Sequence, residues 1–400
     1  MFLFIDRLGA IEELEYRLGD RVVDVLRRAR IPAASVLVTQ GEAILADSQP
    51  IDPDSSYEAR LIEGYDIGEI RARIHMSYPD PEGLPFIKRR LLPNITGDIG
   101  VEAIATNLES LAGYLIDVLV DTVTRFKLLE AGDRLLVGLS GGVDSSSLLL
   151  ALDDARPRLP PFELIAVTFE DFDSRDQPTY KHADTLAKLL SIEHHIVPAE
   201  LVERAFGLNK PLRQILPDLM ATEYAPMAMY IDHHTTRRAL ELFAEERDIN
   251  KVALGLHVTD LLAGILNSLT TGYTVASLPM RRVGKIDYIY PLAFTSKREL
   301  HLYHQFKTGE LARHSYPNAW ELKPLDRNLY YYLADTLQDY WPGLENFIFS
   351  SHNLKLRREQ PVQTESCSNC GSTLVVQPFM PTTVGECDVC QVLHNAGFRD

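Results

Sequence analysis

Seven residues near the middle of the chain have the types and the spacing needed to hold a phosphate. Residues 140–146 read Ser-Gly-Gly-Val-Asp-Ser-Ser and lie between two apolar runs, 135–139 and 148–150. This pattern predicts a strand, a tight glycine turn and a helix, with backbone N–H groups and the positive end of the helix dipole directed at one anion. The residues predicted to contact the phosphate are Ser140, Gly141, Gly142, Val143, Asp144, Ser145 and Ser146.

This turn is not a Walker A loop, because no Gly-Lys-Ser/Thr sequence ends it. It resembles the SGGxDS loop of the PP-loop ATP pyrophosphatases, adenylating enzymes that include tRNA thiolases, lysidine synthetase and the GMP, NAD and asparagine synthetases. The resemblance implies that ATP binds here and that the turn holds the pyrophosphate released when a substrate is adenylated. It also gives Asp144 a catalytic role beside Mg²⁺. The alternative is an ordinary glycine turn between a strand and a helix.

A second motif follows the apolar run 251–254, where residues 255–260 read Gly-Leu-His-Val-Thr-Asp. It is similar to the G-H-N-x-D-D element of the tRNA-thiolating branch, although only Gly255 and Asp260 stand at matching positions. The resemblance implies that Gly255 contacts ATP and that Asp260 is catalytic. Two carboxylates across a pocket could hold Mg²⁺ through phosphates and water. Asp260 could instead be only the N-cap of the helix that follows it.

The segments that must position these motifs alternate between strand-like and helix-like patterns. Such alternation predicts an α/β fold, a doubly wound parallel sheet with helices on both faces, which the resemblance makes PP-loop or HUP-like. Ligands of such sheets bind at the carboxyl ends of the strands, near the switch point in strand order, where the loop lies. The expected strands are 135–139, 164–169, 195–197 and 251–254, and the expected helices are 101–129, 180–190, 225–247 and 261–269.

The end of the second expected strand is a candidate for the adenine pocket. In the ATP pyrophosphatases backbone groups at this place hold adenine, so the resemblance implies that Thr168 and Phe169 contact ATP. The alternative is that they are two ordinary residues at a strand end.

Residues 1–70 predict a separate module. Strand-like runs at 1–5, 14–18 and 35–39, with a helix that begins after Asp20, give an order that resembles the β-grasp fold of ubiquitin-like sulfur carriers. Those carriers end in a free Gly-Gly, whereas this chain continues, so the module cannot be a carrier unless it is cleaved. A docking role and a plain stabilising role both stay open. With 7 basic and 14 acidic residues in this range, direct RNA binding is the weaker option.

The four cysteines of the chain form two C-x-x-C pairs with 16 residues between them: Cys367, Cys370, Cys387 and Cys390. This spacing is typical of a zinc ribbon, in which four thiolates hold a structural Zn²⁺ in a closed tetrahedral site. The expected divisions are the β-grasp module 1–70, a linker at 71–100, the PP-loop domain at 101–355 and the zinc ribbon at 356–400.

The chain departs from its resemblance at one important point. Thiolases of this architecture hold an iron–sulfur cluster with a C-x-x-C pair before the fourth strand and a third cysteine later. The corresponding places fall near Met229, Asp232 and Ser315. Because none of them is a cysteine, we expect no iron–sulfur cluster held by cysteines outside the tail.

The amino-acid composition and the lengths of the apolar runs exclude several classes of protein. Of 400 residues 46% are hydrophobic and 24% charged, as in globular proteins, and the net charge of −16 argues against bulk attraction to nucleic acid. Residues 1–5 are too short for the apolar part of a signal peptide, and no run reaches the roughly 20 apolar residues of a membrane span. We therefore expect a cytoplasmic protein without a membrane partner.

The motifs and the resemblance together predict an ATP-dependent adenylating enzyme that activates a carbonyl oxygen, on a tRNA base, for attack by sulfur, as in tRNA thiolation, or by nitrogen. Its partners would be tRNA and a separate sulfur-carrier protein. Whether the chain forms a homodimer stays open. Two other functions stay open: an amide or amine ligase that acts on a small molecule, and a nucleotide-binding scaffold without catalysis.

Overall fold

The computed structural model describes residues 1–6, 9–62, 89–92, 100–103, 107–170, 178–271, 277–309, 325–340, 343–358, 364–375 and 385–399. The chain divides into two compact units, Met1–Asp80 and Pro81–Asp400, which are described here one at a time.

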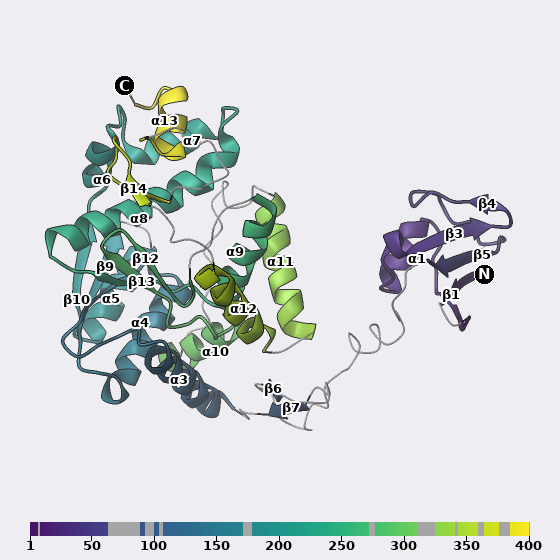
Figure 1. The fold of residues 1–400 in the computed structure, drawn as a ribbon, viewed down its shortest axis with the longest axis horizontal. Helices are drawn as coiled ribbons and strands as arrows, with labels where there is room; N and C mark the ends of the chain where they lie inside the picture. Colours follow the sequence, from purple (N-terminus) through teal and green to yellow (C-terminus); the bar gives the residue numbers. More distant parts are fainter. Residues whose placement is uncertain are drawn as a thin grey trace. The chain divides into compact units, whose positions relative to one another are not determined.

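In its described residues, 1–6 and 9–62, the first unit is a five-stranded mixed sheet with one α-helix packed on it (Figure 1). The strand order is β2-β1-β5-β3-β4, in which β1 and β5 are parallel and the other pairs antiparallel. Alternate residues of β1, β3 and β5 face α1 and form one apolar core with it, as the period of two in a strand requires. The elements are β1 Phe2–Ile5, β2 Ile11–Glu13, α1 Val22–Arg28, the 3₁₀ turn η1 Ala33–Ser35, β3 Val36–Gln40, β4 Ala43–Ile44 and β5 Tyr57–Leu61.

Two expectations for this unit are wrong in detail. The second strand is Ile11–Glu13 and not 14–18, and Arg21, not Asp20, caps α1. Asp20 instead accepts a hydrogen bond from the backbone of Arg17 and pairs with Arg28, so its carboxylate braces the turn before the helix.

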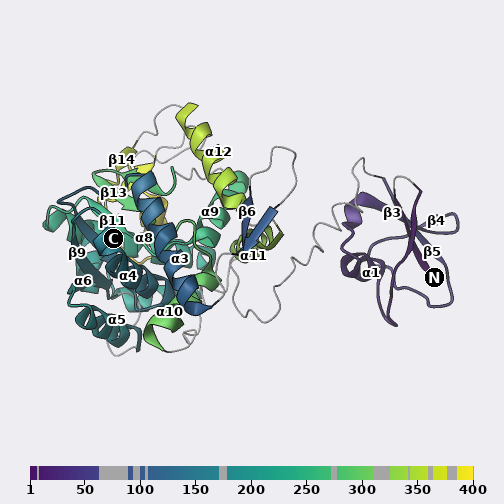
Figure 2. The same ribbon diagram turned by 90° about the horizontal axis from the view of Figure 1, so that it is seen from below.

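The second unit contains a six-stranded sheet in the order β10-β9-β8-β11-β13-β12 (Figures 1 and 2). All neighbours are parallel except the edge pair β12–β13, so the predicted parallel α/β sheet is confirmed. The strand order proceeds one way from β8 to β10 and the other way from β11, which places the switch point between β8 and β11. The strands are β8 Arg134–Gly138, β9 Glu163–Phe169, β10 Glu193–Val197, β11 Lys251–Ala253, β12 Met280–Val283 and β13 Ile286–Ile289.

Helices cover both faces of this sheet. Neighbouring residues of β8 point to opposite sides, so Leu135 and Val137 belong to one core and Leu136 to the other. The first core is completed by α3 Leu108–Arg125, α4 Val143–Ala155, α5 Pro178–Leu189 and α10 Lys297–Thr308. The second includes α6 Ala199–Phe206, α7 Leu212–Leu219, α8 Ala228–Glu246, α9 Val258–Thr271, α11 Leu325–Tyr340 and α12 Leu344–Arg358.

The segment before the sheet differs from expectation. The long helix predicted at 101–129 begins only at Leu108, where Asn107 and Ser110 form a reciprocal capping box. Two short antiparallel strands precede it, β6 Arg89–Leu92 and β7 Gly100–Ala103. β6 lies in the range expected to be linker, most of which falls outside the described residues. Among the described helices none is both long and apolar enough to cross a membrane.

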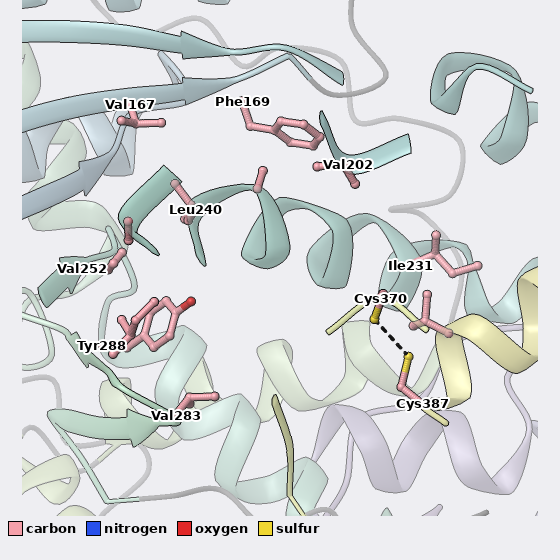
Figure 3. Packing of buried hydrophobic residues seen from close by; sticks show 14 of the residues in the cluster. Val167, Phe169, Val202, Ile231, Leu240, Val252, Val283, Tyr288, Cys370 and Cys387 are labelled. Carbon is pink, nitrogen blue, oxygen red and sulfur yellow. Dashed lines mark hydrogen bonds between the residues drawn. The ribbon is translucent and has the colours of Figure 1, made fainter. Parts of the chain in front are cut away.

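The C-terminal residues form a small module on the second face of the sheet. Its elements are β14 Thr364–Ser366, β15 Thr373–Val375 and α13 Asp388–Asn395. All four cysteines and three apolar residues of the module belong to the same core as α8 and the sheet (Figure 3). The module is therefore part of the domain core and not an appended tail.

Candidate ATP site and cysteine cluster

The predicted phosphate turn lies between β8 and α4, at the carboxyl end of a strand beside the switch point. Gly141 has φ +80°, in the left-handed region that glycine adopts without strain, and Gly142 is the N-cap of α4. The helix begins at Val143. The first backbone N–H groups of α4, which have no acceptor within the helix, therefore lie in the glycine turn itself.

Two serine side chains shape the turn from inside. The Oγ of Ser145 accepts from the backbone N–H of Ser140 at 3.1 Å and donates to the Gly142 carbonyl at 3.2 Å. The Oγ of Ser140 lies 3.1 Å from that of Ser145 and accepts from the N–H of Gly142 at 3.3 Å. The Oγ of Ser146 is buried without a hydrogen-bond partner among the described residues.

Gly255 brings the second motif against the first. A Cβ placed on Gly255 would lie 2.8 Å from the carbonyl carbon of Asp144, 2.9 Å from its oxygen and 2.9 Å from the nitrogen of Ser145. Only a residue without a side chain allows this approach, since real Cβ atoms do not come so close to a backbone. β8 and β11 are neighbours, so the two predicted motifs meet at the switch point.

Asp144 is bonded to a residue that the sequence did not single out for a role. Its Oδ2 accepts a hydrogen bond from the ammonium group of Lys297, the first residue of α10. Its Oδ1 is buried and has no partner among the described residues. The signal that could have identified Lys297 is a lysine in the first turn of the helix after the last parallel strand.

Asp260 supports the start of α9. It lies three residues after His257, accepts from the backbone N–H of His257 at 3.1 Å, and lies 3.3 Å from its Nε2. The other carboxylate oxygen accepts from the hydroxyl of Tyr331 on α11 at 2.8 Å. Asp260 is thus not the N-cap residue, but it does serve the cap by reaching back to it. Its proposed catalytic role is not tested by these contacts.

Thr168 and Phe169 are buried at the end of β9. The hydroxyl of Thr168 donates to the Leu139 carbonyl at 2.6 Å and therefore accepts from Nε2 of His194 at 2.8 Å. Burial lowers the pKa of His194, which favours the neutral ring in this arrangement. The carbonyl of Phe169 accepts from the hydroxyl of Tyr180 at 2.8 Å. Both residues hold the strand end in place, and a role in binding adenine stays a prediction.

The four cysteines form one buried group in which all sulfur atoms lie within 4.8 Å of one another. The sulfur atoms of Cys370 and Cys387, joined by a dashed line in Figure 3, are 3.8 Å apart. Those of Cys367 and Cys390 are 3.9 Å apart. Thiolates at Zn–S distances of ~2.3 Å in a tetrahedron are separated by about 3.8 Å, so the group fits a single zinc ion. Hydrogen bonds from the Cys387 and Cys390 thiols lower the pKa of Cys370.

Arg238 on α8 connects this helix to the cysteine group. Its Nε donates to the carbonyl of Cys370 at 2.9 Å, and its NH1 lies 3.4 Å from a carboxylate oxygen of Glu241 and 3.1 Å from one of Glu245. The guanidinium and the Glu241 carboxylate are both buried, so their contact is shielded from water, whereas Glu245 is 56% exposed. The module is also held at its other end, where the N–H of Asn209 donates to the Phe398 carbonyl at 3.0 Å.

We expect Arg238→Met to lower the free energy of unfolding by about 1–3 kcal/mol, because it leaves the buried Glu241 with only one of its two arginine partners, Arg237 at 3.3 Å, and removes the donor to the Cys370 carbonyl. It should also speed the loss of metal to a chelator, since the carbonyl of Cys370 loses its donor. Denaturant unfolding and the rate of metal release measure the two effects. Replacement of the exposed Arg213 by methionine is the control, and equal release rates in the two variants would contradict the proposed attachment.

The part of the chain that contains the phosphate turn is similar to proteins of known function. Residues 115–231 match the family model described as asparagine synthase. This part of the chain is a PP-loop ATP pyrophosphatase domain. The PP-loop domain also resembles the tRNA-cytidine(32) 2-sulfurtransferases of Pseudomonas fluorescens (strain Pf0-1), 29% identical over 195 residues, and of Neisseria gonorrhoeae (strain NCCP11945), 29% identical over 191 residues.

These matches are partial. Each covers 47% of this chain, and they cover 64% and 55% of the two relatives, so the chain matches less than two thirds of the length of either. Among solved structures the U34-tRNA thiolase NcsA from Methanococcus maripaludis, with its [4Fe-4S] cluster, is similar with a TM-score of 0.52. The identity is 19%, over 72% of this chain and 89% of that one, which supports the PP-loop fold alone.

Proposed function

We propose that the protein is an ATP-dependent adenylating enzyme that thiolates a tRNA base. The contact between Gly255 and the phosphate turn carries this proposal, because it joins the two motifs at the switch point where ligands of such sheets bind. The curated relatives are tRNA sulfurtransferases, which supports tRNA as the substrate class. A cytoplasmic location and a separate sulfur-carrier protein belong to the same proposal.

In this reaction a carbonyl oxygen of the base attacks the α-phosphorus of ATP, and pyrophosphate leaves. A sulfur nucleophile at the oxidation level of sulfide, such as a carrier's thiocarboxylate, then adds to the activated carbon and AMP departs. Water cleaves the bond between sulfur and the carrier's acyl group, so that C=O of the base becomes C=S and the carrier leaves as a carboxylate. The backbone N–H groups of residues 140–146 would hold the departing pyrophosphate, and Asp144 would hold Mg²⁺. Thr168, Phe169 and Gly255 would contact the nucleotide, and Asp260 would steer the activated oxygen.

The fine architecture is part of the proposal. We propose that residues 1–70 are a β-grasp module, that 71–100 link it to the PP-loop domain at 101–355, and that 356–400 are a zinc ribbon. The sulfur–sulfur distances of 3.8–3.9 Å support zinc at the cysteines. An iron–sulfur cluster held by cysteines would have to use the same four, because the chain contains no others.

Exchange of labelled pyrophosphate into ATP, measured with and without tRNA, tests the function. We expect exchange that requires tRNA. Exchange that ignores tRNA would indicate a small-molecule ligase, and absence of exchange would indicate a nucleotide-binding scaffold. Mass spectrometry of the tRNA nucleosides before and after the reaction identifies the thiolated base.

We expect Asp144→Ala and Ser145→Ala each to weaken MgATP binding at least about tenfold, since Asp144 would hold Mg²⁺ and the hydroxyl of Ser145 shapes the phosphate turn. Calorimetric titration with MgATP measures the loss. Ser110→Ala, on α3, is the control, because it removes the hydroxyl that accepts from the Asn107 backbone N–H at 3.1 Å without touching the phosphate turn. Unchanged affinity in both loop variants would remove the basis of the proposal.

A further inference from the structure

The peptide unit that joins Leu139 to Ser140 is the entrance to the phosphate turn, and side chains hold it at both ends. On one side the carbonyl of Leu139 accepts from the hydroxyl of Thr168 at 2.6 Å. On the other the N–H of Ser140 donates to the Oγ of Ser145 at 3.1 Å. Because a peptide unit is planar, these two bonds together fix the direction in which the chain enters the turn.

The hydroxyl of Thr168 can donate to the Leu139 carbonyl only if His194 does not take its hydrogen. A hydroxyl has one hydrogen and a carbonyl oxygen can only accept, so the hydrogen of Thr168 lies toward Leu139. The Nε2 of His194 lies 2.8 Å from the same hydroxyl oxygen and must therefore carry a proton and donate it. A ring protonated only on Nδ1 would instead accept from Thr168 and leave the carbonyl without this donor.

These groups are shielded from water. Thr168 and Leu139 are buried, and the side chain of His194 is 8% exposed. Hydrogen bonds are stronger among buried groups, and a buried carbonyl without a donor is costly. The Nδ1 of His194 lies 3.7 Å from a carboxylate oxygen of Asp184, which is too far for a hydrogen bond. The contact with Thr168 therefore determines which ring nitrogen carries the proton.

We propose that His194 is a positioning residue of the phosphate turn and acts through Thr168. By donating from Nε2 it directs the Thr168 hydroxyl at the Leu139 carbonyl, and the N–H of the same peptide unit then points at Ser145. His194 lies on β10, which β9 separates from β8. The inference rests on the proposed function and deepens it, because it assigns to the pyrophosphate site a residue from a strand that does not adjoin the turn.

The test is a double-mutant cycle of His194→Leu and Thr168→Val, which removes the hydroxyl but keeps the shape of the side chain. Calorimetric titration of the full chain with magnesium pyrophosphate and with adenosine gives two affinities for each variant. We expect each single variant to weaken pyrophosphate about 3- to 10-fold and adenosine less than about twofold. The double variant should bind pyrophosphate within about twofold of Thr168→Val, because His194 acts only through the hydroxyl.

Two further variants are matched controls. His194→Gln keeps an N–H donor near the place of Nε2, so it should recover most of the lost affinity. His195 is the next residue of β10, but its ring lies 5.2 Å from that of Phe243 and pairs with Glu193. His195→Leu should therefore leave pyrophosphate affinity within about twofold. Nitrogen chemical shifts of the His194 ring should show a proton on Nε2 in the free chain.

The outcomes separate this inference from the proposed function. Additive losses in the cycle, or a proton on Nδ1 of His194 alone, would show that His194 does not act through Thr168. A parallel loss of adenosine affinity would indicate a general disturbance of the strand ends and would also overturn the inference. If the wild-type chain does not bind pyrophosphate, both proposals fail. If the affinities behave as expected but no pyrophosphate exchange occurs, the proposed reaction fails and His194 keeps its role.

Discussion

Replacing Cys370 by serine is expected to lower the free energy of unfolding by at least about 4 kcal/mol, with a fall in melting temperature of about 10 °C. The four sulfur atoms lie in the core that α8 shares with the sheet, so loss of a ligand opens that core as well as the metal site. A metal that binds only the folded chain adds its binding free energy to stability. Removal of the metal by a strong chelator should produce a loss of the same order.

Elemental analysis and thermal unfolding check this expectation together. We expect one zinc per wild-type chain and much less in the Cys370→Ser variant. Ser368→Ala is the matched control, because it removes a hydroxyl that donates to the Gly385 carbonyl at 2.7 Å without changing a ligand. It should cost about 1 kcal/mol or less. Iron with acid-labile sulfide in place of zinc would show that the four cysteines hold a cluster, and full stability without any metal would contradict a structural role.

Replacing Gly255 by alanine is expected to lower both the stability of the protein and its affinity for MgATP, although it adds only one methyl group. The new Cβ would meet backbone atoms of Asp144 and Ser145 at 2.8–2.9 Å, and backbone cannot rotate away as a side chain can. We expect a loss of about 1–3 kcal/mol in the free energy of unfolding, because overpacking displaces the turn. MgATP affinity should fall at least about tenfold, since the N–H groups of the turn would no longer converge.

Gly264→Ala on α9 is the matched control, because a Cβ there meets nothing within 4 Å. Alanine is the better helix former, so this variant should gain about 0.5–1 kcal/mol and bind MgATP normally. Denaturant unfolding and titration with MgATP give both quantities for both variants. Normal ATP binding by Gly255→Ala would mean that the two motifs meet without serving one ligand.

Local patterns predicted the central sheet and its helices well, and the edges of the domain less well. Apolar runs of strand length identified β8, β9 and β11, because a strand buried on both faces is apolar throughout. The edge strand β12 and its neighbour β13 were not predicted, since they are short and mix polar with apolar residues. The long helix before the sheet was extended too far, because the capping box at Asn107 was not recognised.

The sequence by itself determined the strand–turn–helix of the phosphate turn and the two cysteine knuckles, because both depend on residues close together in the chain. Only the tertiary structure decided what these motifs contact. The sheet order brings Gly255 against Asp144, the packing of α10 on α4 brings Lys297 to the same carboxylate, and the path of α8 brings Arg238 to Cys370. These pairs are separated by more than 100 residues, and local periodicity does not encode which strands and helices become neighbours.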